Sequence, residues 1–494
     1  MLRRPLVARS GGARRTIIMG DSGKSSRSVA AGPLRRVNRG IMSVWMGWGT
    51  RVLPFADVAT EDLPLSRLLR LSLIQVSVGV SLVLLAGTLN RVMIVELGVP
   101  ATLVGVMLAL PLLFAPFRAL IGFRSDRHQS ALGWRRVPFI FRGTMLQFGG
   151  LAMMPFALLV LAGAGQSSTA PAWIGQAAAG IAFLLVGAGV HITQTVGLAL
   201  ATDQAPESAH PNIVGLMYSM LLIGMILAAL LFGAALADFS HGRLIQVIQG
   251  TAVITFVLNV SALWKQEARN TSRPEEVGRT FQQSWALYAA EAHAVRRLVA
   301  VALGTLAFSM EDILLEPYGG QILGLGVGDT TKLTATFAGG GLLGFALASR
   351  ILSRGFDPFR MATIGALIGI PAFVMVIASA PLQQVPMFVA GVALIGFGGG
   401  LFGHGTLTAT MNYAPKDQIG LALGSWGAAQ ATAAGVGAAL GGFLRDVVNP
   451  AGLALPWQPA ATGYILVYSL EIMLLIATLA TMLPLLHSGR RAPA

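Results

Sequence analysis

The sequence contains no cysteine and few charged residues. Without cysteine, the 494-residue chain has no disulfide, no thiolate nucleophile and no thiolate metal site. Asp, Glu, Lys and Arg together make up 11% of the residues, against about 25% in soluble domains. Because 54% of the residues are hydrophobic, this composition excludes a soluble globular protein and predicts a chain that crosses a membrane several times.

Recognisable enzyme motifs are also missing. The chain has no GxxxxGK[ST] phosphate-binding loop, no HExxH and no nucleophile elbow, so we expect no enzymatic activity. The net charge of +14 raises the question of nucleic-acid binding. The basic residues, however, lie mostly before and between hydrophobic segments, where they encode orientation in the membrane. We therefore expect membrane lipids, and no nucleic acid, as partners.

Twelve hydrophobic segments are long enough to cross a bilayer, and they form two groups of six. Span four ends in GLALATDQAP and span ten in LTATMNYAP, with Pro206 and Pro415 at corresponding positions. This pattern predicts an all-α polytopic membrane protein of the major facilitator type, with two pseudo-symmetric halves and ligands bound between them. The predicted spans are residues 71–95, 100–121, 138–163, 172–200, 212–236 and 244–264, then 297–325, 331–352, 360–380, 386–410, 418–443 and 461–486.

Loops rich in Lys and Arg alternate with loops that lack them, which places both termini in the cytoplasm. Residues 1–41 are rich in Arg, Ser and Gly and are expected to be disordered; Met42 is an alternative start, and translation from it would exclude them from the protein. The predicted organisation is a cytoplasmic, largely disordered segment (1–66), the first half (67–264), a cytoplasmic linker with an amphipathic helix (265–296), the second half (297–487) and a cytoplasmic tail (488–494).

Span seven contains the segment FSMEDILLEPYGG, residues 308–320, with three carboxylates in an apolar run. An acidic side chain at mid-bilayer costs roughly 2.5–3.5 kcal/mol. On a helix, Asp312 and Glu316 would share a face, and Pro317 would interrupt the helix. Two interpretations follow: a buried ion pair that joins two helices, or a ligand or proton site. The predicted cavity residues of this segment are Glu311, Asp312, Glu316 and Tyr318.

Arg91 is the unusual residue of span one. It lies about as far into span one as Glu316 lies into span seven, and these helices face each other in a two-fold-related bundle. We therefore expect an Arg91–Glu316 contact that gates the cavity or holds an acidic ligand group. The alternative is a salt bridge at the rim with Glu96.

The loop GFRSDRHQSALGWRR, residues 122–136, resembles the major-facilitator pattern G-x-x-x-D-[RK]-x-G-[RK]-[RK], although about four extra residues interrupt it. An acidic side chain here can accept hydrogen bonds from a helix N-terminus or an arginine and hold the halves in one state. The alternative is a loop that only sets orientation. The matching residues are Gly122, Asp126, Arg127, Gly133, Arg135 and Arg136.

Four longer strings resemble a narrower family, the PucC/LhaA or bacteriochlorophyll-delivery group of major-facilitator-like proteins. They are LPFADVATEDLPLSRLLRLSLIQVSVG, TLNRVMIVELGVP, LPLLFAPFRALIGFRSDRHQSALGWRRVP and FSMEDILLEPYGGQILG. The resemblance covers about residues 53–486 and implies a non-enzymatic assembly factor in the bacterial inner (intracytoplasmic) membrane. It implies bacteriochlorophyll as cargo, light-harvesting α and β polypeptides as recipients, and membrane insertion machinery and chlorophyll synthase as partners. The DVATEDLPL string is closer to the LhaA-like subgroup.

A pigment carrier needs an apolar cavity and an axial ligand for the magnesium of its cargo, for which an imidazole or a hard oxygen is suitable. His191 in span four and His404 in span ten are the predicted ligands, and the span-seven carboxylates are an alternative; we expect no metal site of the protein's own. Each histidine could also be a hydrogen-bonded packing residue. A second hypothesis is a proton-coupled transporter of a small or amphipathic molecule, which also uses intramembrane carboxylates and arginine.

Overall fold

The computed structural model describes most of the membrane-spanning part of the chain. The described residues are 65–113, 121, 125, 133–163, 171–204, 210–267, 285–286, 289–291, 293–413, 419–448 and 459–488. The predicted disordered segment, most of the linker with its amphipathic helix, and the tail lie outside these residues.

All regular structure in the described residues is helical. Eleven helical segments are long and apolar enough to cross a membrane, and a shorter apolar helix covers Ala101–Leu112, so the twelve predicted spans are present. The α-helices are α2 (Leu65–Leu82), α3 (Ala101–Leu113), α5 (Val137–Leu161), α6 (Ala172–Asp203), α7 (His210–Ala235), α8 (His241–Leu263), α10 (Ala294–Ala307), α11 (Leu315–Gln321), α12 (Val327–Leu352), α13 (Pro358–Leu382), α14 (Val385–Tyr413), α15 (Ile419–Val448) and α16 (Thr462–Ser488). Shorter elements are the π-helical η2 (Val83–Leu89) and η3 (Val92–Glu96) and the 3₁₀ turns η6 (Glu311–Ile313) and η7 (Pro459–Ala461).

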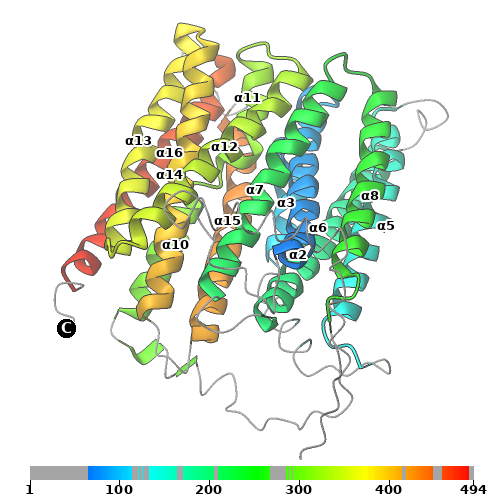
Figure 1. The fold of residues 1–494 in the computed structure, drawn as a ribbon. Helices are drawn as coiled ribbons and strands as arrows, with labels where there is room; N and C mark the ends of the chain where they lie inside the picture. The colour runs from blue at the N-terminus through cyan, green and yellow to red at the C-terminus, as the bar shows by residue number, and fades with distance from the viewer. Residues whose placement is uncertain are drawn as a thin grey trace, which may run out of the picture.

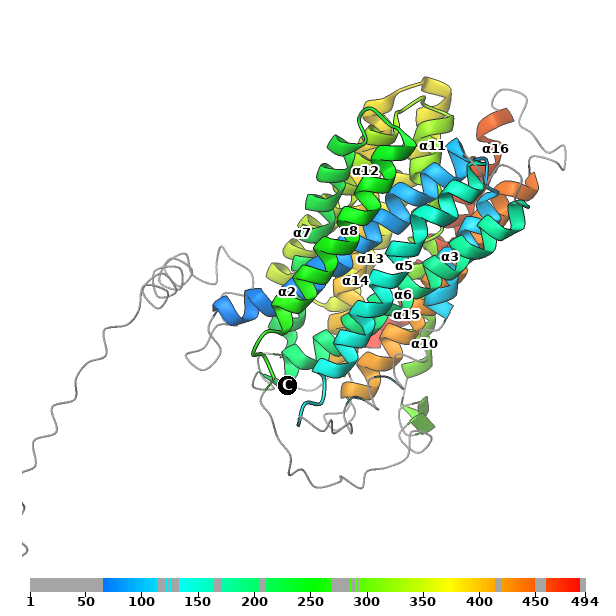
Figure 2. The ribbon, with the colours of Figure 1, turned by 90° about the vertical axis from the view of Figure 1, so that its right-hand side faces the viewer.

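The helices form two bundles that lie side by side (Figures 1 and 2). Elements α2 to α8 make the first half and α10 to α16 the second, and each half has its own apolar core. Two seams join them, α3 against α15 and α7 against α12. We call the end where α2 begins and α16 ends the terminal end, and the end where α3 begins and α11 finishes the opposite end.

Glycines bring the backbones of the two halves into contact along both seams. A Cβ atom on Gly105 of α3 would lie 2.6 Å from the carbonyl oxygen of Ala438 on α15. A Cβ atom on Gly233 of α7 would lie 2.8 Å from the carbonyl oxygen of Gly328 on α12. Because real side chains do not approach so closely, only glycine allows these crossings, as is usual for helices packed in lipid.

The glycine-rich helices α12 and α14 also pack with their backbones in close contact, inside the second half. A Cβ atom on Gly340 would clash with the carbonyl oxygen of Ala393, whereas nothing lies within 4 Å of a Cβ atom on Gly339. The two adjacent glycines therefore differ in what they permit: Gly340 sets the distance between two helices and Gly339 does not.

We predict that Gly340→Ala destabilises the protein and that Gly339→Ala does not. Overpacking of a fixed interface costs about 1–3 kcal/mol, because one backbone must move away from the other. The measurement is thermal unfolding of the purified protein in detergent. Equal melting temperatures for the two variants would show that α12 and α14 do not pack in this register.

Candidate functional site

The carboxylate-rich segment lies where span seven stops being a regular helix. Helix α10 ends at Ala307, the 3₁₀ turn η6 follows, and the chain becomes α-helical again in α11. The backbone N–H of Leu314 donates to the carbonyl oxygen of Glu311 over 2.8 Å, which closes the tight turn. The interruption was predicted at Pro317, but it comes earlier. Pro317 is the third residue of α11, where the backbone N–H has no partner within the helix in any case.

Span one is irregular at the same depth and faces this break. It passes from α2 into the π-helical segments η2 and η3, and η2 contacts η6. The side-chain amide of Asn90 donates to the backbone carbonyl oxygen of Asp312 over 3.3 Å. One half of the bundle thus supplies a hydrogen-bond donor to a carbonyl group of the interrupted helix in the other half.

Arg91 joins the halves through a different partner from the one expected. Its guanidinium forms an ion pair with Glu96, and its Nη2 donates to the backbone carbonyl oxygen of Leu325 over 3.1 Å. No ion pair between Arg91 and Glu316 forms, so the predicted contact is wrong and the alternative pair with Glu96 is present. The reason is local: the π-helical turns place Arg91 and Glu96 on one side of span one.

Glu316 lies close to Arg91 but is held by a hydroxyl group. It is buried, its Oε1 accepts a hydrogen bond from the hydroxyl of Thr334, and its Oε2 has no partner among the described residues. A Cβ atom on Gly87 of span one would lie 2.9 Å from Oε1. The carboxylate is therefore enclosed between span one, α11 and α12.

Glu311 faces a second acid that sequence reasoning missed. Its carboxyl group lies next to that of Glu471 on α16, and both residues are 0% exposed. Apart from each other, their four carboxyl oxygens have no hydrogen-bond partner among the described residues. The hydroxyl of Tyr468, one turn away on α16, is also buried and has no partner in the part of the chain that the structure describes. A buried carboxyl pair needs a donor, which a shared proton or a bound ligand can supply. Glu471 could have been singled out from the sequence, because it is the only acidic residue in the predicted span 461–486.

Asp312 differs from both of its acidic neighbours. It is exposed, whereas the residues on either side of it are buried. Since Leu314 separates η6 from α11, Asp312 and Glu316 do not share one helical face, and that prediction is wrong. Of the three carboxylates, Asp312 is the one whose side chain is not buried by the protein.

Tyr318 occupies a packing position rather than the predicted cavity position. It is 0% exposed, and its hydroxyl donates to the carbonyl oxygen of Val376 over 2.9 Å. Its ring packs against Phe388, Tyr464 and Tyr468, with ring centroids 5.3–5.6 Å apart. These contacts anchor α11 to α13, α14 and α16.

The two predicted histidines lie on corresponding helices, His191 on α6 and His404 on α14, and both are half-buried. The ring of His404 packs on Phe345, with the centroids 4.1 Å apart. Its Nδ1 is buried without a hydrogen-bond partner among the described residues. His404 lies nearer the terminal end than the carboxylates do, so the structure does not bring the histidines and the acids into one cluster. Within the described residues there is no group of three or more His, Cys, Asp and Glu side chains arranged to hold a metal ion.

The predicted conformational loop is described in part, because Gly122, Asp126 and Arg127 lie outside the described residues. Gly133 has a φ of 77°, which favours glycine. Both following arginines pair with Asp203 at the end of α6, and Arg136 also donates to the hydroxyl of Ser125 over 2.5 Å. These contacts tie the loop to the terminal end of the first half.

Comparison with known sequences finds one matching family and several relatives that are similar over most of their length. The family described as PUCC protein matches residues 88–490. "Protein PucC" of Rhodovulum sulfidophilum is 62% identical, over 81% of this chain and 89% of that protein. "Protein PucC" of Cereibacter sphaeroides is 56% identical, over 90% of this chain and 97% of that protein. "Bacteriochlorophyll synthase 44.5 kDa chain" of Rhodobacter capsulatus is 29% identical, over 86% and 97%.

Solved structures with the same fold are transporters. A variant of the nucleoside transporter NupG superimposes with a TM-score of 0.63 at 13% identity, over 84% of this chain and 99% of that chain. A bacterial homologue of the lysosomal transporter Spinster, inward-facing and unoccupied, gives a TM-score of 0.59 at 15% identity, over 84% and 94%. The chain therefore has the major-facilitator-like fold that the sequence predicted.

The difference in exposure between Asp312 and Glu311 can be tested with cysteine. Because the chain has no cysteine of its own, single-cysteine variants report one position each. We predict that a water-soluble thiol reagent modifies Asp312→Cys in the folded protein, and modifies Glu311→Cys only after denaturation. Intact-mass spectrometry measures the added reagent. Equal modification of the two folded variants would contradict the arrangement of the broken helix.

Proposed function

The chain belongs to the PucC family, and from this premise we propose that it is a non-enzymatic membrane assembly factor that binds bacteriochlorophyll and delivers it to light-harvesting antenna polypeptides. The name of the relative from Rhodobacter capsulatus connects that protein to bacteriochlorophyll. The transporter fold supports a carrier, because such folds bind ligands between their two halves. The LhaA-like subgroup stays a prediction.

His404 is the observation that carries the pigment part of this proposal. Its Nδ1 is enclosed, and its Nε2 makes no hydrogen bond within the described part of the chain. Packing on Phe345 holds the ring in a fixed orientation. Neither ring nitrogen has a partner among the described residues, so one can carry the proton and the other can act as an axial ligand for the magnesium of a pigment; an aromatic neighbour suits a flat macrocycle.

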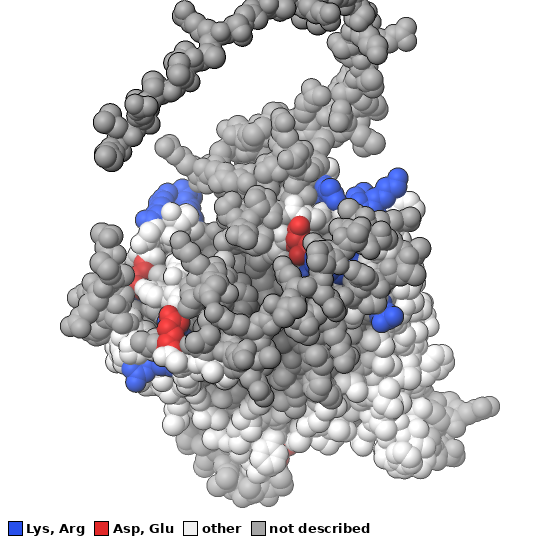
Figure 3. Space-filling model, turned by 90° about the horizontal axis from the view of Figure 1, so that it is seen from below, with Lys and Arg blue, Asp and Glu red and all other residues white. Residues whose placement is uncertain are grey.

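Delivery requires that the cargo is held without being chemically altered. In this proposal the apolar walls of the bundle receive the hydrocarbon tail, and the polar junction around Arg91 and Glu316 closes the opposite end. The recipients are the antenna α and β polypeptides, with the membrane insertion machinery and chlorophyll synthase acting beside the protein in the bacterial inner membrane. Both termini are proposed to be cytoplasmic. Basic side chains at the rim of the terminal end support that orientation (Figure 3).

A second candidate function is proton-coupled transport, and the carboxyl groups of span seven favour it. The buried pair of Glu311 and Glu471 has no donor from any other described residue, and the exposed Asp312 lies beside it. A proton carrier uses this kind of arrangement, because an isolated carboxyl group inside a membrane protein binds and releases protons as its surroundings change.

We predict that the protein purified in mild detergent from a phototrophic host retains bacteriochlorophyll, and that His404→Leu retains much less. The matched control is His241→Leu, because His241 is exposed at the opposite end. Absorption spectroscopy of the purified samples, normalised to protein, measures the bound pigment. A folded wild type without pigment, or equal losses in the two variants, would contradict the assignment of His404.

The transporter hypothesis makes a different prediction in proteoliposomes. If it holds, a proton gradient drives substrate uptake, and Asp312→Asn abolishes it while Asp329→Asn, at an exposed position of α12, does not. Pigment retention without uptake would favour the assembly factor, and uptake without pigment would favour the transporter.

A further inference from the structure

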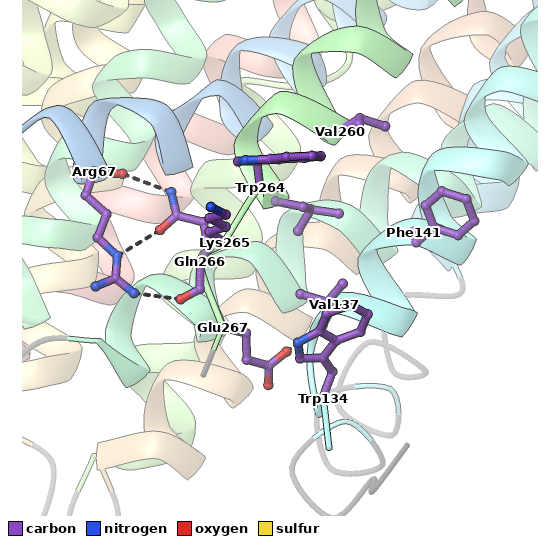
Figure 4. Close-up of a pocket in the computed structure, with 10 residues that line it drawn as sticks. Arg67, Trp134, Val137, Phe141, Val260, Trp264, Lys265, Gln266 and Glu267 are labelled. Atoms are coloured by element: carbon purple, nitrogen blue, oxygen red, sulfur yellow. Dashed lines mark hydrogen bonds between the residues drawn. The ribbon is translucent and has the colours of Figure 1, made fainter. Parts of the chain in front are cut away.

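A groove lies away from the junction between the halves, at the terminal end of the first half. It has a volume of about 630 Å³ and opens between the start of α2, the start of α5 and the end of α8 (Figure 4). It is independent of the residues on which the proposed function depends. Its position at the ends of three membrane-spanning helices places it at the boundary between hydrocarbon and headgroups.

The walls of the groove are apolar. Val137 and Phe141 of α5 form one side, and Val260 and Leu263 of α8 form the other. Phe141 is 46% exposed. An unbranched hydrocarbon chain suits such a surface, because it removes the apolar area from water at the level where the bilayer becomes polar.

Tryptophans and cations form the rim of the groove. Trp134 and Trp264 border it, and Trp264 is 63% exposed. Tryptophan is enriched at the membrane–water interface, where its ring lies at headgroup level. The two cationic residues of the lining are Arg67 and Lys265.

Reciprocal hydrogen bonds fix this rim. Arg67 donates to the side-chain oxygen of Gln266 over 3.2 Å and to its backbone oxygen over 2.7 Å, and the Gln266 amide donates back to the Arg67 backbone over 3.2 Å (Figure 4). Gln266 is only 1% exposed. The guanidinium is therefore held in one orientation by a buried partner that leaves its positive charge uncompensated.

The one acid of the lining, Glu267, forms no ion pair with either cation. Glu267 accepts hydrogen bonds from the backbone N–H groups of Arg135, Arg136 and Val137 over 2.8–3.0 Å, so it caps the N-terminus of α5. Lys265 has a φ of 54° and forms no ion pair or hydrogen bond among the described residues. Two cations and one carboxylate give the described lining a net charge of +1, so the groove has a positive rim above an apolar floor.

We propose that this groove binds an anionic phospholipid, with the phosphate between Lys265 and Arg67 and one acyl chain between Phe141 and Val260. The charge complementarity selects an anionic headgroup, the tryptophans set its depth, and the apolar walls receive the chain. Basic pockets between membrane-spanning helices recognise phospholipid headgroups on the same physical grounds.

Native mass spectrometry of the detergent-purified protein tests this proposal, with phosphatidylglycerol and phosphatidylcholine as probes. We expect preferential binding of phosphatidylglycerol, and about fivefold weaker binding in Lys265→Gln, which corresponds to the effect of one lysine near an anionic surface. Val260→Trp keeps the charges but fills the groove, so it should lose phosphatidylglycerol. Arg350→Gln is the matched control, because Arg350 is exposed at the terminal end of the other half.

Each variant is first checked for an unchanged elution volume and melting temperature. Equal binding of the two lipids, unchanged binding in Lys265→Gln, or an equal loss in Arg350→Gln would overturn the proposal. The proposal would also be overturned if the Val260→Trp variant still bound phosphatidylglycerol and lost only a co-purified pigment or detergent. The assay needs no bacteriochlorophyll, so its outcome is separate from that of the pigment experiment.

Discussion

Every backbone polar group inside a lipid bilayer must find its partner within the protein, and this constraint governs the centre of the bundle. The break in span seven exposes backbone groups of residues 308–314 that a continuous helix would pair. The structure satisfies some of them through the tight turn at Leu314 and through the amide of Asn90 on span one. The irregular segments of the two spans therefore depend on each other. Neither half could present its polar residues in this arrangement alone.

The span pattern could be predicted from the sequence, because apolar length alone decides which segments cross a bilayer. The location of the break could not be predicted from Pro317. A proline in the first turn of a helix removes no internal hydrogen bond, so α11 includes it and the interruption falls at η6. The same error placed Asp312 and Glu316 on one face, since the i, i+4 rule holds only along a continuous helix.

Other features depend on contacts that apolar periodicity does not encode. Arg91 pairs with Glu96 because π-helical turns change the directions of the side chains in span one. Glu471 was missed although it stands alone in an apolar span, because its importance comes from Glu311 on another helix. The groove below α2, α5 and α8 combines residues nearly 200 positions apart, as the Arg67–Gln266 contact shows. Such sites can be recognised only from the three-dimensional arrangement of the helices.

The glycine crossings of the two seams have a mechanical consequence. At Gly105 and Gly233 a backbone carbonyl oxygen of the other half lies against the glycine, and a backbone group has no rotamer change by which to take up a displacement. Packed interfaces are not continuously deformable, so neither half can translate towards the other at these points. The remaining freedom is rotation about an axis through the crossings. Rotation about that axis is the relative motion that these contacts oppose least, and under such a rotation the residues far from the axis would be displaced the most.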